Sequence, residues 1–97
     1  LIDVGGLKVN PLEVELVLRQ HAAVEDCIVV AIKQSQTVLR LKAIVTARPG
    51  HASVPIDELR ELARKHLSAY KIPRVFEVRD SLPKSSTGKV LRHLVEA

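Results

Sequence analysis

Two consecutive runs of β-branched and other apolar residues set the strongest limit on how this chain can fold. The runs are VEDCIVVAIK at residues 24–33 and VLRLKAIVTA at residues 38–47, and the polar segment QSQT separates them. Such runs favour strands, and a short polar connection favours an antiparallel hairpin. Apolar and basic residues alternate over LRLKA in the second run. This alternation predicts a strand with one covered face and one wetter face.

Two other segments have the features of helices. Asn10 precedes Pro11, and Glu13 follows in the first turn. Asn caps free N–H groups, Pro fits the first helical position and Glu favours the positive end of the helix dipole, so we predict a helix over residues 11–20. From Pro55, the segment PIDELRELARKHL places its apolar residues on one helical stripe and its charged residues outside it, which predicts a second, amphipathic helix.

Shorter elements complete the predicted order. Apolar stretches flank Gly5-Gly6, a pair that supplies positive φ angles for a tight hairpin turn. VFEV at residues 75–78 predicts a short strand, and the apolar spacing after Lys89 predicts a final helix that begins near that residue. The order ββ-α-β-β-α-β-α describes a small α+β domain with a mixed sheet, hairpins and about three packed helices. We expect residues 1–97 to form this single domain.

Composition argues against several classes of function. The chain has 97 residues, of which 46% are hydrophobic, a net charge of +4, one Tyr and one Phe. The charge suits a phosphate-bearing partner but is too small and scattered to identify one. Because single-stranded nucleic acids usually stack on aromatic side chains, nucleic acid is disfavoured as a partner. The longest apolar run, residues 28–32, is too short to span a bilayer, and we expect a soluble cytoplasmic domain.

The residue types that build metal and nucleophilic sites are scattered. Cys27 lies inside a predicted buried strand, where we expect it to act as a small core hydrophobe. The four histidines have no short spacing to one another or to Cys27, and the acidic residues form no recognisable metal loop. No bound metal is therefore expected.

The segment PKSSTGKVLR at residues 83–92 contains Gly88-Lys89, which invites comparison with a phosphate-binding P-loop. A P-loop requires glycine at the position of Pro83 and a hydroxyl residue at the position of Val90. Both requirements fail, so the P-loop is excluded.

Three motifs in fixed order resemble one known family. They are GGLKVNPLEVE at residues 5–15, LSAYKIPRVFEV at residues 67–78 and LPKSSTGKVLR at residues 82–92. Together they resemble the C-terminal domain of the AMP-forming acyl-CoA synthetases, a superfamily that includes peptide-synthetase adenylation domains and luciferases. The resemblance covers essentially the whole chain. It implies a mobile domain that serves two half-reactions: a carboxylate attacks ATP to give an acyl-adenylate and pyrophosphate, and after domain rotation a thiol captures the acyl group.

For adenylation, the resemblance implies that Lys89 enters the active site. Its ammonium would neutralise the incoming carboxylate and the charge that develops on the α-phosphate. Gly88 would let the loop approach closely, and Ser85, Ser86 and Thr87 would keep it mobile and solvated. The residues alone leave an alternative open, in which Lys89 only begins the last helix, although a cation is unfavourable there.

For thioester formation, the resemblance implies that Gly5 and Gly6 replace the lysine and line a pantetheine tunnel, because a wall of backbone needs residues without side chains. A hairpin turn alone would also explain this pair. Tyr70, Lys71 and Arg74 fall where related CoA ligases contact the CoA nucleotide, the cations with phosphates and Tyr70 with adenine. The two cations are equally explained as charges on a solvated face.

The resemblance also implies substrates and partners outside this chain. A carboxylic acid, ATP and CoA are the expected substrates. A large N-terminal domain of the same chain is expected to hold the acyl group and ATP with its Mg²⁺. We expect Leu1 to be an internal cut in a longer protein, so this chain alone should not catalyse the reaction. One departure is Asp3, where many relatives have a lysine whose role cannot be transferred.

Two alternatives remain open at this point. One is the C-terminal subdomain of a peptide-synthetase adenylation domain that loads a carrier protein, which a carrier domain beyond Ala97 would favour. The other is a non-catalytic basic module that binds a nucleotide or RNA, which tight, salt-dependent binding would favour. A regulatory hypothesis accompanies the lysine loop: acylation of Lys89 would remove the charge that adenylation needs.

Overall fold

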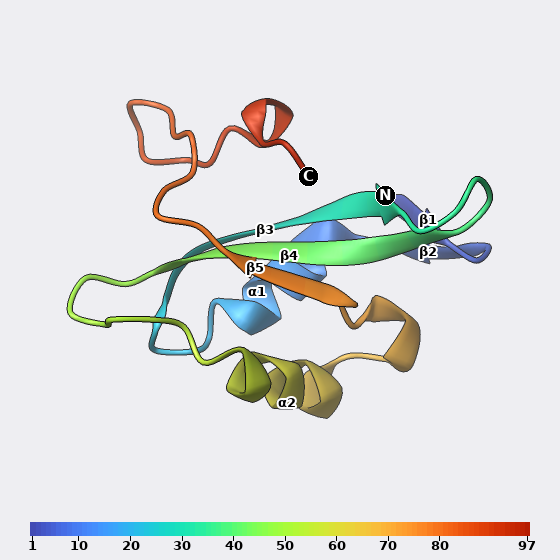
Figure 1. The fold of residues 1–97 in the computed structure, drawn as a ribbon, viewed down its shortest axis with the longest axis horizontal. Coiled ribbons are helices and arrows are strands. Elements are labelled where there is room, and N and C mark those ends of the chain that lie inside the picture. Colours follow the sequence, from blue (N-terminus) through green and yellow to red (C-terminus); the bar gives the residue numbers. More distant parts are fainter.

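The computed structural model describes residues 1–97, and its elements follow the predicted order as far as residue 78 (Figure 1). The strands and helices are β1 (Ile2–Val4), β2 (Leu7–Val9), α1 (Pro11–Leu18), β3 (Val24–Lys33), β4 (Leu39–Ala47), α2 (Ile56–His66) and β5 (Val75–Val78). Short 3-10 turns occur at Ala69–Lys71 and Arg92–Leu94. Neither α-helix combines the length and hydrophobicity that crossing a membrane requires.

The main sheet has the order β3-β4-β5 and is mixed, as predicted. β3 and β4 form the predicted antiparallel hairpin, and β5 pairs with β4 in parallel. Helix α2 belongs to the crossover that a parallel pair requires. β1 and β2 form a separate antiparallel hairpin, and β3 keeps one edge free of any strand.

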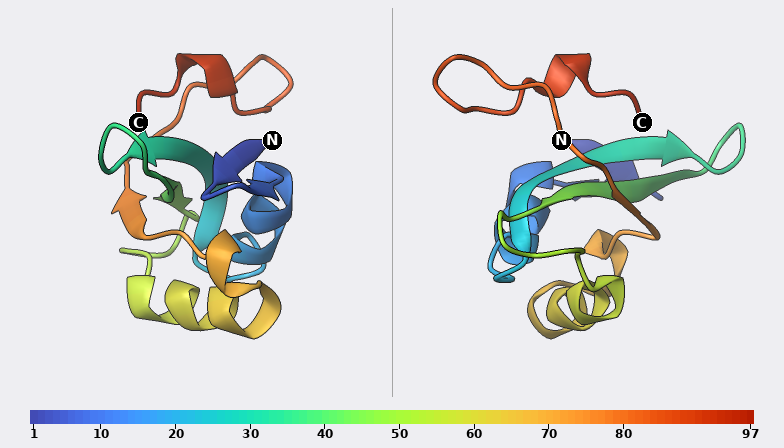
Figure 2. Two further views of the ribbon diagram at one scale, coloured as in Figure 1. Left: turned by 90° about the vertical axis from the view of Figure 1, so that its right-hand side faces the viewer. Right: turned by 60° about the vertical axis from the view of Figure 1, so that its left-hand side comes forward.

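The central sheet is covered on both faces, which explains why its strands carry apolar residues on both sides. Helices α1 and α2 lie on one face, and the C-terminal segment, residues 79–97, lies across the other (Figures 1 and 2). On the helical face, Val29 and Leu41 are buried with Leu59 of α2. On the opposite face, a smaller cluster consists of Ile28, Ile44 and Leu82, with Val30, Val90 and Val95 packed against it.

The predicted helix beginning near Lys89 is wrong, and the chain has two α-helices rather than about three. Lys84 and Val90 form an isolated antiparallel bridge, and the Leu91 N–H donates to the Pro83 carbonyl at 2.8 Å. The apolar residues of this segment pack on the open face of the sheet, and that burial outweighs their helical spacing. Lys89 therefore does not begin a helix, which excludes the alternative that its only role is to start one.

The predicted helix cap at Asn10 and the predicted burial of Cys27 are both confirmed. The Asn10 Oδ1 accepts from the Leu12 N–H at 3.0 Å at the start of α1, which ends at Leu18, short of the predicted residue 20. Cys27 is buried in the core, and burial, assisted by the negative charge of Glu15, raises the pKa of its thiol to about 12. The cysteine is thus the small core hydrophobe that the sequence predicts.

An acid-sensitive ion cluster joins β4 to the end of β5. The Glu77 carboxylate binds the Arg79 guanidinium and the Lys42 ammonium, the latter at 2.6 Å. These cations, Arg79 foremost, lower the pKa of Glu77 from 4.5 to about 2. A carboxyl group whose pKa is lower in the folded than in the unfolded state contributes stability above the unfolded pKa, and this contribution is lost as pH falls toward the folded pKa.

We therefore expect Glu77→Gln to flatten the loss of stability between about pH 4.5 and about pH 2. The free energy of unfolding, measured by urea titration at several pH values, should fall less steeply in this variant than in the unchanged protein. Asp80→Asn is the matched control, because Asp80 is an exposed carboxylate nearby. Equal slopes for Glu77→Gln and the unchanged protein would contradict the assignment.

Candidate functional site

Lys89 lies in a polar loop that is closed by its own hydrogen bonds. The Ser85 N–H donates to the Lys89 carbonyl at 2.8 Å, and the Gly88 N–H donates to the Ser85 carbonyl at 3.0 Å. The hydroxyl oxygens of Ser85 and Thr87 lie 2.8 Å apart. Gly88 has a φ of +85°, which favours glycine at this turn. Ser85, Ser86 and Thr87 were expected to keep the loop mobile and solvated, whereas the side chains of Ser85 and Thr87 contribute hydrogen bonds that close it.

The side chain of Lys89 is exposed and belongs to none of the ion pairs of the chain. It borders two depressions, of about 600 Å³ beside Leu1 and about 270 Å³ beside Arg19. A Cβ placed on Gly88 would meet no atom of this chain within 4 Å. A close approach at Gly88 therefore has to involve a molecule or domain outside these residues. The loop thus presents an uncompensated cation beside concave surface.

Ion pairs anchor both ends of this loop to the body of the domain. Lys84 Nζ lies 2.6 Å from Asp26 Oδ2 on β3, and Arg92 binds Glu15 on α1. The sequence alone predicts no role for these four side chains. Glu15 gives a local signal, because it lies among the apolar residues of α1 and a carboxylate that is buried there requires a hydrogen-bonding or ionic partner.

The glycine turn between β1 and β2 is confirmed as a hairpin turn. Gly5 and Gly6 have φ angles of +60° and +86°. Asp3 braces the turn: its Oδ1 accepts from the Gly6 N–H at 2.7 Å, and its Oδ2 lies 2.9 Å from Lys8 Nζ on the paired strand. The bond from Lys8, followed by that from Gly6, lowers the pKa of the Asp3 carboxyl. The residue that departs from the family pattern therefore has a local structural role.

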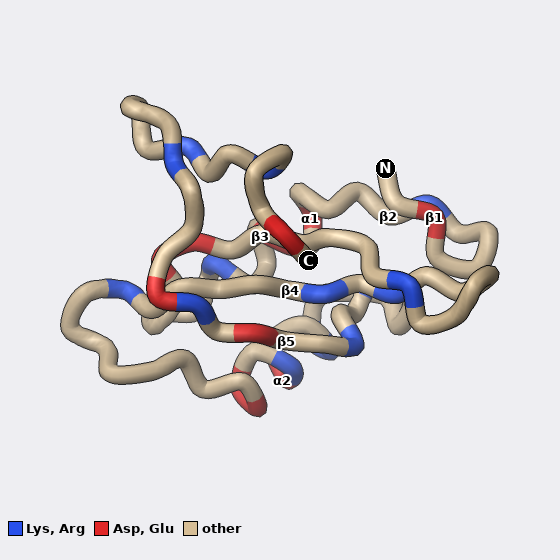
Figure 3. The backbone as a smooth tube through the Cα atoms, turned by 45° about the horizontal axis from the view of Figure 1, so that its top comes forward, with Lys and Arg blue, Asp and Glu red and all other residues tan.

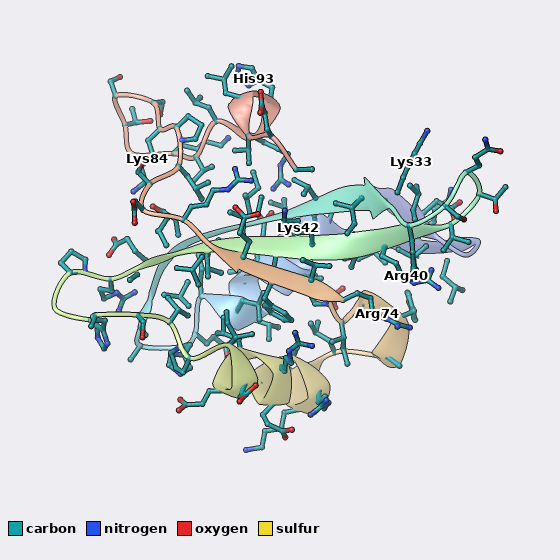
Figure 4. All side chains as sticks on the ribbon, in the orientation of Figure 1. Lys33, Arg40, Lys42, Arg74, Lys84 and His93 are labelled. Carbon is teal, nitrogen blue, oxygen red and sulfur yellow. The ribbon has the colours of Figure 1, made fainter.

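The glycine turn and the YKIPR segment meet in one depression of about 290 Å³. Gly5, Tyr70 and Arg74 line it, together with Arg40 of β4, which the sequence analysis placed only on the wetter face of a strand. Figure 4 shows Arg40 and Arg74 near each other at one end of the sheet. The Arg40 Nη1 donates to the Leu39 carbonyl at 3.0 Å, whereas its buried Nε has no hydrogen-bond partner. A buried donor without a partner is unusual, and this makes Arg40 a candidate binding residue.

Lys71 does not join the other predicted residues at this depression. Its ammonium lies 2.9 Å from Glu13 Oε1, and this hydrogen bond raises the pKa of Lys71. The ammonium also lies 5.6 Å from the centre of the Tyr70 ring. Lys71 thus ties the 3-10 turn at Ala69–Lys71 to α1 in this structure.

The lysine loop and the glycine turn line different depressions and lie toward opposite ends of the domain (Figures 1 and 4). Lys84, at the start of the lysine loop, is far from Arg40 and Arg74 along the long axis. Basic and acidic residues are interspersed along the backbone (Figure 3). No group of three or more His, Cys, Asp or Glu side chains is arranged to hold a metal ion.

An α+β domain with a closed lysine loop at one end and a braced glycine turn at the other defines a recognisable class of enzyme domain. The model of the family of AMP-binding enzyme C-terminal domains matches residues 13–89, and the chain belongs to this family.

The chain spans less than a fifth of the length of the relatives that it matches. The chain is 37% identical over 92 residues to a long-chain-fatty-acid–CoA ligase of Bacillus subtilis, covering 95% of this chain and 16% of that protein. It is 41% identical over 88 residues to a 3-oxocholest-4-en-26-oate–CoA ligase of Rhodococcus rhodochrous, covering 91% and 16%. The structure of an anthranilate CoA ligase in complex with anthranoyl-AMP matches with a TM-score of 0.85 and 34% identity, covering 95% of this chain and 18% of that one.

Proposed function

We propose that this chain is the C-terminal domain of an AMP-forming acyl-CoA synthetase and that two of its surfaces act in turn at one active site. The observation that carries the proposal is that the uncompensated Lys89 and the glycine turn line separate depressions of one small domain. Because the two surfaces lie apart, one leaves the site when the other enters. A rotation of the whole domain then switches the enzyme between its half-reactions.

In the first half-reaction, Lys89 acts on the carboxylate and ATP. A carboxylate oxygen attacks the α-phosphorus, the bond to the pyrophosphate oxygen breaks, and an acyl-adenylate and pyrophosphate form. The ammonium neutralises the carboxylate as it approaches the phosphate and stabilises the charge that accumulates on the α-phosphate oxygens. ATP, its Mg²⁺ and the acyl chain are assigned to a large N-terminal domain of the same chain.

In the second half-reaction, the backbone of Gly5 and Gly6 guides the pantetheine arm of CoA. The thiolate attacks the acyl carbonyl carbon, and AMP leaves. Tyr70 packs against the nucleotide base, while Arg74 and Arg40 bind phosphate oxygens. This assignment is supported by the common depression that Gly5, Tyr70, Arg74 and Arg40 line and by the unpartnered Nε of Arg40. Lys71, held by Glu13, is assigned to the support of Tyr70 rather than to direct phosphate contact.

We expect Arg74→Ala and Arg40→Ala each to raise the KM for CoA about tenfold, the equivalent of one charge-assisted hydrogen bond of about 1.5 kcal/mol. Steady-state kinetics of the full-length enzyme with varied CoA would measure this, and the KM for ATP should stay unchanged. Lys33→Ala, which removes an exposed cation outside this depression, is the matched control. An unchanged KM for CoA in both arginine variants would contradict the CoA assignment.

The proposed function as a whole is tested with the full-length protein, ATP, a panel of carboxylic acids and CoA. We expect acid-dependent release of AMP and pyrophosphate together with an acyl-CoA product. Acid-dependent adenylation with transfer solely to a phosphopantetheinylated carrier protein would favour the peptide-synthetase alternative. Salt-dependent RNA binding without any acid-dependent release of pyrophosphate would overturn the enzyme assignment in favour of a binding module.

A further inference from the structure

An ion pair between a buried carboxylate and a partly exposed guanidinium joins two residues that lie far apart in the sequence. Glu15 on α1 is 5% exposed. The Arg92 Nη2 donates to both of its carboxylate oxygens, at 2.9 Å to Oε1 and 2.7 Å to Oε2. The same two side chains also bind Val29 of β3: its N–H donates to Glu15 Oε2 at 2.7 Å, and its carbonyl accepts from Arg92 Nη1 at 3.0 Å. The three residues therefore form a closed ring of hydrogen bonds.

This ring pairs the outward backbone groups of Val29 at the free edge of the main sheet. β3 is an edge strand, so the outward N–H and carbonyl of Val29 have no neighbouring strand to bind. Glu15 supplies the acceptor and Arg92 the donor. Without Arg92, the Glu15 carboxylate would keep one backbone N–H but would remain a buried charge without its counterion. Arg92 thus ties the C-terminal segment to both α1 and β3.

The same guanidinium lies three residues after Lys89. Because no α-helix follows Lys89, no α-helical hydrogen-bond ladder fixes the backbone around it. Instead, the loop is closed by the Lys84–Val90 bridge and anchored at its two ends by Lys84 with Asp26 and by Arg92 with Glu15. Lys89, Arg92 and Glu15 line the same depression of about 270 Å³.

We propose that Arg92 and Glu15 form a positioning pair for the adenylation step: the Arg92 guanidinium, bound through Nη2 to both oxygens of Glu15, holds the lysine loop in the position from which Lys89 reaches the reacting groups. This inference rests on the proposed role of Lys89. Arg92 acts through Lys89 and touches no substrate. The glycine turn lines a different depression, toward the other end of the domain (Figure 1), so loss of the pair leaves thioester formation intact.

The test uses Arg92→Ala in the full-length enzyme and measures each half-reaction separately. Carboxylate-dependent exchange of pyrophosphate into ATP should fall about 10- to 100-fold, since a misplacement of about 1 Å can cost about 100-fold. Thioester formation from supplied acyl-adenylate and CoA should change less than about twofold. Arg92→Lys should recover little of the loss, because an ammonium cannot bridge both oxygens of Glu15 and the Val29 carbonyl in one planar fork. Arg64→Ala, which removes an exposed guanidinium from α2, is the matched control.

A double variant separates positioning from general destabilisation. If Arg92 acts through Lys89, Lys89→Ala combined with Arg92→Ala should lower adenylation no further than Lys89→Ala alone. Parallel loss of both half-reactions, with additive effects in the double variant, would overturn the positioning role. If Arg92→Ala does not fold, Glu15→Gln, which keeps the shape and removes the charge, provides the same comparison and should show the same selective loss.

The outcomes also distinguish this inference from the proposed function. Full adenylation by Lys89→Ala would refute the proposed role of the lysine itself. Loss of adenylation in Lys89→Ala together with normal adenylation in Arg92→Ala would refute the positioning pair alone.

Discussion

Lys89→Ala in the full-length enzyme is expected to lower the rate of adenylation by about 10²- to 10³-fold, the cost of removing one group that stabilises charge in a transition state. Lys89 forms no ion pair within this chain, so its charge is available to an external anion. Its removal should therefore leave the domain folded. Capture of the acyl group by CoA should continue, because the lysine has left the active site in that step.

Pyrophosphate exchange measures the first half-reaction, and conversion of supplied acyl-adenylate to acyl-CoA measures the second. Lys89→Gln, which keeps most of the side chain without its charge, should behave like the alanine variant. Lys65→Ala on α2 controls for the loss of an exposed lysine in general. Normal exchange by both Lys89 variants would remove the lysine from the mechanism.

Gly6→Leu is expected to have the reverse effect, lowering thioester formation by roughly 10²-fold with little loss of adenylation. Gly6 has a φ of +86°, and a Cβ at this position would point into space that is open in this chain. A leucine side chain would occupy that space, through which we propose that the pantetheine arm passes. It would also strain the backbone by about 1–3 kcal/mol.

Gly50→Leu separates these two effects. Gly50 has a comparable φ of +94°, also faces open space, and lies in the connection between β4 and α2. Its leucine variant should lose similar thermal stability while forming thioester at the normal rate. Equal damage to thioester formation by both glycine variants would mean that Gly6 matters only for the fold of the hairpin.

The parts of the fold that the sequence predicted are those with strong local signals. The β-branched runs at 24–33 and 38–47 became β3 and β4, and Gly5-Gly6 became a turn with two positive φ angles. These features depend on propensities and backbone angles that each segment carries itself. The mixed sheet was also predicted.

The wrong prediction of a C-terminal helix arose because the structure of this segment depends on tertiary packing rather than on local signals. The apolar residues after Lys89 have helical spacing, yet Val90 and Val95 pack against Ile28 and Ile44 on a sheet face that the helices leave open. Whether such a face exists depends on how distant segments assemble. Spacing within the segment therefore could not decide its structure.

The candidate site likewise contains residues that local motifs predict and residues that only tertiary contacts bring together. Lys89 and the glycine pair were singled out because they lie in recognisable motifs. Arg40 and Arg74 line one depression because β5 pairs in parallel with β4. Arg92 forms its ion pair with Glu15, a residue near the other end of the sequence. Such partners depend on tertiary contacts and leave no short-range pattern in a single sequence.

The central claim, that one domain presents two surfaces in turn, is tested most directly by comparing Lys89→Ala and Gly6→Leu for a single quantity. That quantity is the ratio of the adenylation rate to the rate of thioester formation, measured in one full-length background. The account predicts that the ratio falls in Lys89→Ala and rises in Gly6→Leu. A ratio that changes in the same direction in both variants, or that is unchanged in both, would contradict the claim that the two surfaces act in turn.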